Sequence, residues 1–141
     1  MINPTRIDHT RMPYLASLLI EKERYNTSFH MPGHKGTMTL HPMLEAYIGH
    51  EIYAADLVEI NGIIDYLHSP KGALKEAQEM AADAYGADHT FFLINGSTVG
   101  NEGAIMSVAR AGQKVIMARA SHRSVYGGVV LSGATPVYIP P

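Results

Sequence analysis

The sequence predicts an α/β fold built on a parallel sheet. From residue 69 onward, short apolar runs alternate with stretches in which apolar side chains recur every three or four positions. This alternation gives the order helix, strand, helix, strand, helix, strand, which is typical of α/β proteins. The segments between the predicted strands, 95–113 and 119–134, are each longer than the dozen residues that a parallel crossover requires.

The N-terminal half predicts helices that are separated by a long loop. Residues 13–26 carry apolar side chains at spacings of three and four, followed by a charged end, as in an amphipathic helix. Residues 29–41 are rich in Gly, Pro and His and are expected to form a loop. A short helix is predicted over 42–47, whereas the pattern over 52–68 favours neither helix nor strand.

The C-terminal half carries clearer signals for where its elements begin and end. Ser69 is a capping residue, Pro70 suits the first turn of a helix, and Gly86 is placed to end that helix. The run 91–94 contains two aromatic residues and is predicted as a strand buried on both faces. Pro136 favours an edge position for the last strand. The predicted strands are 90–94, 114–118 and 135–139, and the helices between them are 99–111 and 122–131.

Composition and charge argue against several classes of function. The 141 residues are 46% hydrophobic, which is enough apolar material for a core, and carry a formal net charge of -2. Because no basic run is present, the sequence offers no electrostatic support for nucleic-acid binding. There is no cysteine for disulfides or thiolate metal sites, and no apolar run approaches the length of a membrane span. We therefore expect a cytoplasmic protein with no nucleic-acid or membrane partner.

The turn over residues 95–101, N-G-S-T-V-G-N, is the most informative motif. It follows a predicted strand and opens a helix, at the sheet edge where ligands usually bind. Gly96 permits a bend and the close approach of a ligand, while Ser97 and Thr98 add hydroxyl donors to the free amides and the positive dipole end of the helix. Together these groups suit a phosphate. The alternative is that Ser97 or Thr98 merely caps the helix.

His122 lies in a second turn, R-A-S-H-R-S, after the next predicted strand. This turn is expected at the same edge of the sheet as Ser97, where an imidazole is able to stack on a flat ring whose phosphate is held nearby. Polar residues in turns usually serve the turn itself. A histidine that starts the next helix, or that faces solvent, is therefore the alternative.

The loop over residues 29–36, F-H-M-P-G-H-K-G, carries two histidines four residues apart. His30 and His34 have a spacing that suits zinc on one helix face, but the Pro-Gly between them opposes a helix and no third ligand is obvious nearby. A rigid loop positioned by Pro32 and Gly33 is favoured over a metal site. Contact of this loop with a different ligand stays open.

Three carboxylates, Asp56, Glu59 and Asp65, precede the helix predicted from Ser69. Two or three carboxylates suit acid–base chemistry. Such residues also cap helix starts and offset the helix dipole, and this second interpretation is favoured because it is the more common use.

Taken in order, these segments resemble the ornithine/lysine/arginine decarboxylase family. Each segment by itself is indecisive, whereas their succession is specific. They run from about residue 29 to residue 141 without large gaps: F-H-M-P-G-H-K-G, D-x-x-E, D-Y-L-H-x-P-x-G, A-Q-E-x-A-A-x-A-Y-G-A-D, F-F-L-I-N-G-S-T-V-G-N, R-A-S-H-R-S-V and G-A-T-P-V-Y-I-P-P.

The resemblance implies the large domain of the aspartate-aminotransferase-like fold, with pyridoxal phosphate as the cofactor. Residues 1–28 are then an N-terminal segment with a helix. Residues 29–141 are the N-terminal part of the cofactor-binding domain, truncated at 141.

The resemblance also implies the residues that hold the cofactor. Its phosphate is expected at Gly96, Ser97 and Thr98, and His122 is expected to stack on its pyridine ring. No metal site is expected.

The implied function is release of carbon dioxide from ornithine, lysine or arginine by a homo-oligomeric enzyme. The catalytic lysine of the family forms a Schiff base from within a Ser-x-His-Lys motif, and no lysine of this chain stands in such a motif. That lysine is expected beyond Pro141, so these 141 residues by themselves are expected to be inactive. The alternatives are a stand-alone phosphate- or cofactor-binding module, and an aminotransferase or aldolase of the same fold.

Overall fold

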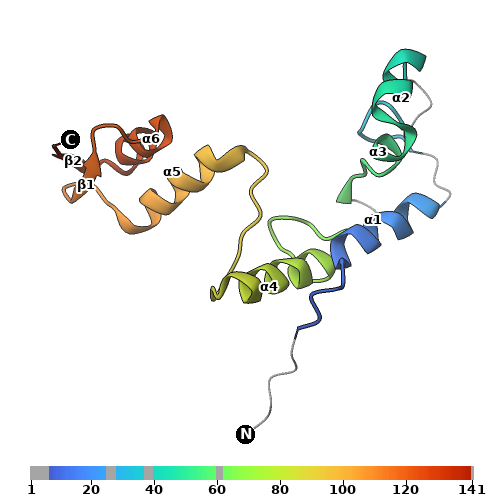
Figure 1. Cartoon of the computed structure of the whole chain (residues 1–141), viewed down its shortest axis with the longest axis horizontal. Helices are drawn as coiled ribbons and strands as arrows, with labels where there is room; N and C mark the ends of the chain where they lie inside the picture. The colour runs from blue at the N-terminus through green and yellow to red at the C-terminus, as the bar shows by residue number, and fades with distance from the viewer. Residues whose placement is uncertain (1–6, 25–27, 37–39, 60–61, 141) are drawn as a thin grey trace, which may run out of the picture. The chain divides into compact units, whose positions relative to one another are not determined.

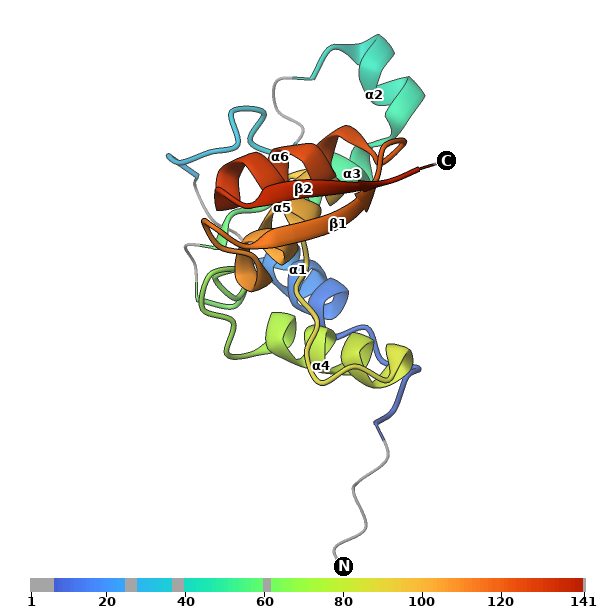
Figure 2. The same cartoon turned by 90° about the vertical axis from the view of Figure 1, so that its left-hand side faces the viewer.

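A computed structural model of the chain describes residues 7–24, 28–36, 40–59 and 62–140. The chain consists of two compact units, Met1–Phe91 and Phe92–Pro141. Figures 1 and 2 show the elements of each unit, coloured from blue at the N-terminus to red at the C-terminus. No helix in the described ranges is long and apolar enough to cross a membrane.

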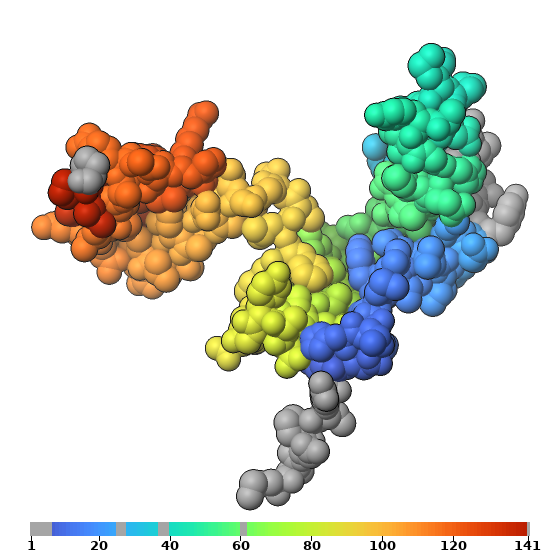
Figure 3. Space-filling view, in the orientation of Figure 1, coloured from blue at the N-terminus to red at the C-terminus, as the bar shows by residue number. Residues whose placement is uncertain are grey.

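The first unit is made of helices and loops. Polar contacts hold the segment before α1 (Pro13–Glu23) against α4 (Ala73–Tyr85), because Arg11 donates to Glu76 and His9 Nε2 lies 2.7 Å from a carboxylate oxygen of Asp83. In Figure 3 the blue atoms of the N-terminal segment lie against the yellow-green atoms of α4. The helices are α1 (Pro13–Glu23), α2 (Pro42–Ile48), α3 (His50–Ala54) and α4 (Ala73–Tyr85). The buried side chains include Ser17, Glu21, Ile64, Leu74 and Ala82.

The second unit is a small α/β arrangement. Its elements in chain order are α5 (Gly96–Val108), β1 (Lys114–Ala118), α6 (Arg123–Ser132) and β2 (Thr135–Ile139). The strands run parallel, with Lys114 opposite Thr135 and Ala118 opposite Ile139. Figure 2 shows the two strands side by side, with α6 behind them as the crossover.

The second unit is held together by close packing of α5 and α6 and by contacts of α6 with β2. At Gly128, a Cβ would lie 2.8 Å from Cδ1 of Ile105 and 3.2 Å from the backbone Cα of Glu102, so only glycine permits this separation of the helices. The rings of Tyr126 on α6 and Tyr138 on β2 have centroids 6.3 Å apart. The buried side chains of this unit are Ala109, Met117, Ser124 and Val129.

The two strands of the described sheet confirm the predicted strands over 114–118 and 135–139 and their parallel pairing. Pro136 of β2 lies opposite Val115 of β1. Among the described residues, β2 pairs with β1 alone, so its other edge is open. This position agrees with the edge strand that Pro136 predicts, since proline donates no hydrogen bond to a further neighbour.

The predicted strand over 90–94 is wrong. Among the described residues this segment belongs to no sheet, and Phe91, Leu93 and Ile94 are exposed. A strand needs a partner for its backbone N–H and C=O groups, and an apolar run does not reveal whether a partner exists. The described sheet therefore has two strands instead of three.

The helices α1, α2 and α6 confirm the predicted helices to within a few residues, and residues 25–26 of the first prediction lie outside the described ranges. Gly86 ends α4 as predicted, with a left-handed φ of 64°. The predicted start of α4 at Ser69 is wrong, because the helix begins at Ala73. The predicted range 99–111 for α5 is shifted by three residues at each end.

Candidate functional site

The first turn of α5 presents backbone amides and two hydroxyls to the outside. Gly96 has a φ of +72°, a conformation that favours glycine, and it turns the chain straight into the helix. Ser97 and Thr98 follow in the first turn, where both are exposed. Asn95 precedes the helix without making a side-chain cap. The free amides and the positive end of the helix dipole are therefore available to an anion.

The start of α6 is built around His122. Its Nδ1 atom accepts a hydrogen bond from the backbone N–H of Ser124 at 3.2 Å, which caps the helix. The Ser124 hydroxyl lies 2.8 Å from the same nitrogen, and Asn101 Nδ2 donates to that hydroxyl at 2.7 Å. His122 thus starts the helix, as one of the two interpretations predicted, while its ring stays exposed.

A pocket of about 690 Å³ brings the two helix starts together. Its lining includes Thr98 and Glu102 from α5 and His122, Arg123 and Tyr126 from α6. Of the four predicted site residues, Thr98 and His122 therefore share one pocket. Gly96 and Ser97 lie in the same helix turn as Thr98 but are not among the residues that line it.

The Asp65 carboxylate caps the start of α4. Its Oδ2 atom accepts hydrogen bonds from the backbone N–H groups of Lys71, Gly72 and Lys75 at 2.9, 2.6 and 3.2 Å. Partial burial raises the pKa of the Asp65 carboxyl, but the hydrogen bonds from Gly72, Lys75 and Lys71 outweigh burial and hold the pKa below its ordinary value. The helix-capping interpretation is confirmed for this residue, and the cap accounts for the start of α4 at Ala73.

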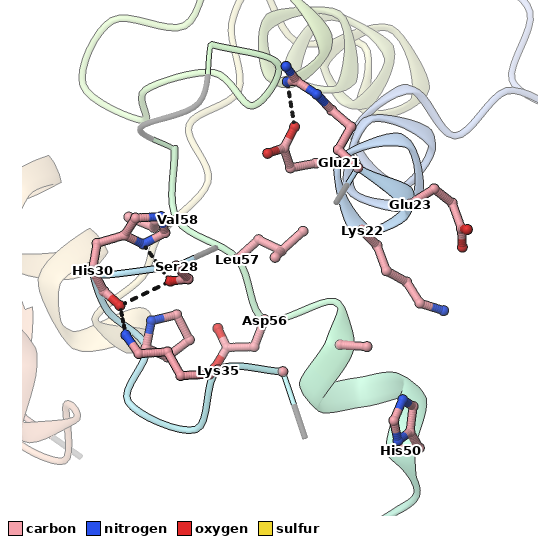
Figure 4. A pocket seen from close by; sticks show the side chains of 14 residues that line it. Glu21, Lys22, Glu23, Ser28, His30, Lys35, His50, Asp56, Leu57 and Val58 are labelled. Atoms are coloured by element: carbon pink, nitrogen blue, oxygen red, sulfur yellow. Dashed lines mark hydrogen bonds and ion pairs between the residues drawn. The ribbon is translucent and has the colours of Figure 1, made fainter. Parts of the chain in front are cut away.

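The loop over residues 28–36 borders a second pocket, of about 390 Å³, in the first unit. Figure 4 shows the side chains of Ser28 and Lys35 directed at the backbone carbonyl of His30. Ser28 Oγ donates to that oxygen at 3.3 Å, and Lys35 Nζ donates to it as well. The polar groups of this loop are thus used to hold its own backbone.

His34 is fixed from both sides of its ring. Its Nε2 atom lies 3.0 Å from Asp56 Oδ2, its Nδ1 atom lies 2.9 Å from the carbonyl oxygen of Gly36, and the edge of its ring meets Tyr53 at 5.3 Å between centroids. These contacts support the rigid-loop interpretation. In the part of the chain that the structure describes, no three His, Asp or Glu side chains form a group able to hold a metal ion.

Sequence reasoning missed the roles of Asn101, Ser124 and Gly128. Asn101 follows Thr98 by three residues on α5, so helical spacing places both on one face. Ser124 follows His122 by two residues, a spacing that suits a helix start. The interhelical contact between them depends on the packing of α5 on α6, which no local pattern reveals.

Comparison with known proteins identifies the family. Residues 12–141 match the family described as Orn/Lys/Arg decarboxylase, major domain. The chain is 42% identical over 129 residues to the arginine decarboxylase of Halalkalibacterium halodurans, and the match covers 92% of this chain and 26% of that protein.

Two solved structures resemble the chain. Lysine decarboxylase A from Pseudomonas aeruginosa matches with a TM-score of 0.74 at 31% identity, over 92% of this chain and 18% of that one. The lysine decarboxylase LdcF of Francisella novicida matches in fold, with a TM-score of 0.77 at 23% identity, over 92% of this chain and 19% of that one. The chain thus spans about a quarter or less of the length of these relatives. The chain belongs to the Orn/Lys/Arg decarboxylase family, and residues 12–141 are a part of that family's major domain.

Proposed function

We propose that this chain supplies the part of a pyridoxal-phosphate-dependent decarboxylase that holds the phosphate and the ring of the cofactor. The observation that carries the proposal is the uncapped start of α5 lying beside His122 at one pocket, in a chain of this family. The proposed substrates are basic amino acids, because relatives of the chain are named as arginine, lysine and ornithine decarboxylases.

The chemistry of the residues fits the phosphate of this cofactor. Ser97 and Thr98 offer two exposed hydroxyl donors, and the side chain of Asn95 does not cap the amides of their helix turn. Gly96 has no Cβ, and nothing lies within 4 Å of the place where one would be, so a phosphate is free to approach its backbone. A dianion at this position is stabilised by the amides and by the dipole of α5.

Each side chain has a defined task in this arrangement. The hydroxyls of Ser97 and Thr98 donate to the phosphate, and the exposed ring of His122 offers a flat face to the pyridine. When bound, pyridoxal phosphate supplies an electron-withdrawing ring that stabilises the charge left by loss of carbon dioxide. The role of this chain is to bind pyridoxal phosphate and fix its orientation, which favours the reaction because the cofactor then adopts fewer unproductive orientations.

The lysine that joins the cofactor covalently is proposed to lie outside residues 1–141, because no lysine here stands in a Ser-x-His-Lys motif. We propose that the matched residues, 12–141, belong to an aspartate-aminotransferase-like large domain, and that the residues up to 28 form the helical segment at its N-terminal side. The parallel pair β1 and β2 and the likeness to the two lysine decarboxylases support this assignment. We further propose a cytoplasmic enzyme, and the lack of disulfides in residues 1–141 is compatible with a reducing compartment.

Carbon dioxide release tests the proposed reaction. The full-length protein that carries this sequence, loaded with pyridoxal phosphate, is expected to release carbon dioxide from at least one of arginine, lysine and ornithine. Residues 1–141 alone are expected to release none above a control without protein. No release from any of the three amino acids by the loaded full-length protein would contradict the proposed reaction.

We also propose that the enzyme is a homo-oligomer. The second unit exposes apolar side chains on both strands and on α6, including Ile116, Val130 and Ile139, and apolar surface of this kind is suited to burial against another chain. Both outer strand edges also lack partners among the described residues, and bare edges favour pairing between chains. Residues 1–141 by themselves are expected to self-associate through this surface, and a monomeric mass of this piece in solution would contradict that expectation. A monomeric mass of the full-length protein would contradict the proposed homo-oligomer.

A further inference from the structure

We propose that Asn101 and Ser124 are positioning residues for His122, which together fix the tautomer of its ring and the plane that the ring presents to the pocket. This inference rests on the proposed function, because it concerns how His122 meets the cofactor. It is carried by a chain of three hydrogen-bonded side chains that joins the starts of α5 and α6.

The backbone of α6 sets the tautomer of His122. The N–H of Ser124 donates to Nδ1 of His122 at 3.2 Å, so this nitrogen carries a lone pair and not a hydrogen. In the neutral imidazole, the ring hydrogen is then on Nε2. A hydrogen on Nδ1 would face the N–H of Ser124, so that two donors would meet with no acceptor between them and the cap of α6 would be lost.

The Ser124 hydroxyl reinforces this tautomer by donating a second hydrogen bond to the same nitrogen. The Asn101 amide nitrogen, 2.7 Å away, is a donor only, so the hydroxyl oxygen accepts from it. The hydroxyl hydrogen is therefore left to donate to Nδ1 of His122, 2.8 Å away. Ser124 is only 2% exposed, which leaves little access for water to replace either partner.

The chain of hydrogen bonds also ties the ring to the proposed phosphate site. Asn101 lies on α5, three residues beyond Thr98, whereas His122 and Ser124 belong to the start of α6. The close packing at Gly128 keeps the two helices near enough for Asn101 to reach Ser124. The orientation of His122 is consequently set relative to α5, the helix whose first turn carries Ser97 and Thr98.

Such anchoring improves cofactor binding by restricting the ring before the cofactor arrives. An exposed histidine that is free to change rotamer loses that freedom when it stacks on a ligand, and this loss weakens binding. Removing the Ser124 hydroxyl takes one hydrogen bond from His122, so we expect pyridoxal phosphate to bind more weakly, by about twofold or more and by no more than in His122→Ala.

The test is a double-mutant cycle on the full-length protein, with the dissociation constant of pyridoxal phosphate as the measured quantity. The variants are Ser124→Ala and Asn101→Ala, each made alone and combined with His122→Ala. Ser107→Ala is the matched control, because Ser107 lies on α5 and bonds only its own helix, at the carbonyl of Ala104. We expect Ser124→Ala and Asn101→Ala to weaken binding when His122 is present and to have no further effect when it is absent. Ser107→Ala should bind as the wild type does.

A second readout uses the protein without its cofactor. Nitrogen NMR of the ¹⁵N-histidine-labelled protein is expected to show His122 with its hydrogen on Nε2, and to show a changed Nδ1 signal in Ser124→Ala. A hydrogen on Nδ1 in the wild type would overturn the inference.

The outcomes separate this inference from the proposed function. If His122→Ala leaves cofactor binding unchanged, the proposed role of His122 fails. If His122→Ala weakens binding but Ser124→Ala does not, the inference fails and the role of His122 stands. An effect of Ser124→Ala that keeps its size in the His122→Ala background would mean a merely structural role, and would likewise overturn the inference.

Discussion

Helix α4 in the first unit and helix α5 in the second are both 13 residues long, but their first turns are stabilised differently. The start of α4 receives the Asp65 carboxylate, which accepts from three backbone amides. The start of α5 receives no side-chain cap from Asn95. The free amides at the start of a helix need an anionic or polar partner, and Asp65 supplies this partner on α4, whereas Asn95 does not supply it on α5.

Under the proposed function, this difference separates residues that stabilise the fold from residues that bind the cofactor. A carboxylate from the protein's own chain holds α4 whether or not any ligand is present. On α5 the side chain of Asn95 makes no such cap, and the exposed hydroxyls of Ser97 and Thr98 add two further donors beside the free amides. Substitutions at Asp65 should therefore change stability, whereas substitutions at Ser97 and Thr98 should change binding.

The largest expected effect is on cofactor affinity, in the double variant Ser97→Ala with Thr98→Ala. Two hydroxyl donors to a charged phosphate are lost, each worth about 1.5–3 kcal/mol, so affinity should fall by about a hundredfold or more. The dissociation constant of pyridoxal phosphate for the full-length protein checks this. The thermal unfolding of the cofactor-free protein should stay close to that of the wild type, and an unchanged dissociation constant would count against the placement of the phosphate.

The second expected effect is on the packing of α5 against α6. Gly128→Ala places a methyl group 3.2 Å from the backbone Cα of Glu102, which cannot move without shifting α5, and we expect a loss of about 1–3 kcal/mol in the free energy of unfolding. Gly127→Ala is the matched control, since its methyl meets only the carboxylate end of the flexible Glu102 side chain at 2.6 Å. Urea denaturation of both variants makes the comparison, and equal losses would contradict the role given to Gly128.

The third expected effect is on the stability of the first unit. Asp65→Ala leaves the backbone amides of Lys71, Gly72 and Lys75 without their acceptor, and caps of this kind are worth about 1 kcal/mol, and up to about 2. The expected result is a lower free energy of unfolding with unchanged cofactor affinity. A variant that keeps its stability but loses cofactor would reverse the contrast between α4 and α5.

The stabilising effect of Asp65 should depend on pH in a defined direction. Its pKa in the folded protein is lowered, so its contribution is complete above the unfolded value of about 3.9 and is lost as the pH falls through the lower folded value. The stability difference between wild type and Asp65→Asn should therefore be constant near neutral pH and shrink in acid. A stability difference between wild type and Asp65→Asn that grows as the pH falls would contradict the lowered pKa of Asp65.

The smallest expected effect is that of His122→Ala on cofactor binding. Loss of one stacked ring should cost about 0.5–1.5 kcal/mol, so affinity should fall by about two- to tenfold, and turnover by the full-length enzyme should slow. The same substitution removes the cap of α6, so the unfolding of the cofactor-free variant must be measured beside its affinity. An affinity equal to that of the wild type would remove His122 from the proposed site.

Local chemistry made some elements predictable from sequence. The strands at 114–118 and 135–139 are predictable because each is a short apolar run between turn residues and the two runs pair with each other. Gly86 is predictable as a helix end because its conformation favours glycine. The turn at Gly96 was recognised for the same reason.

Features that depend on distant partners were not predictable. Residues 91–94 have the apolar pattern of a strand, but they pair with no other strand among the described residues. Ser69 has the side chain of a helix cap, but the carboxylate of Asp65 takes that role. The bond between Asn101 and Ser124 joins residues 23 positions apart on two helices, so it follows only from their packing.

The most direct test of the central claim is a structure of the full-length protein with pyridoxal phosphate bound. The phosphate oxygens are expected within hydrogen-bonding distance of the Ser97 and Thr98 hydroxyls, about 2.5–3.0 Å. The His122 ring is expected with its centroid about 4.5–7 Å from that of the pyridine. A phosphate bound away from the start of α5, or a His122 ring turned away from the cofactor into solvent, would contradict the account.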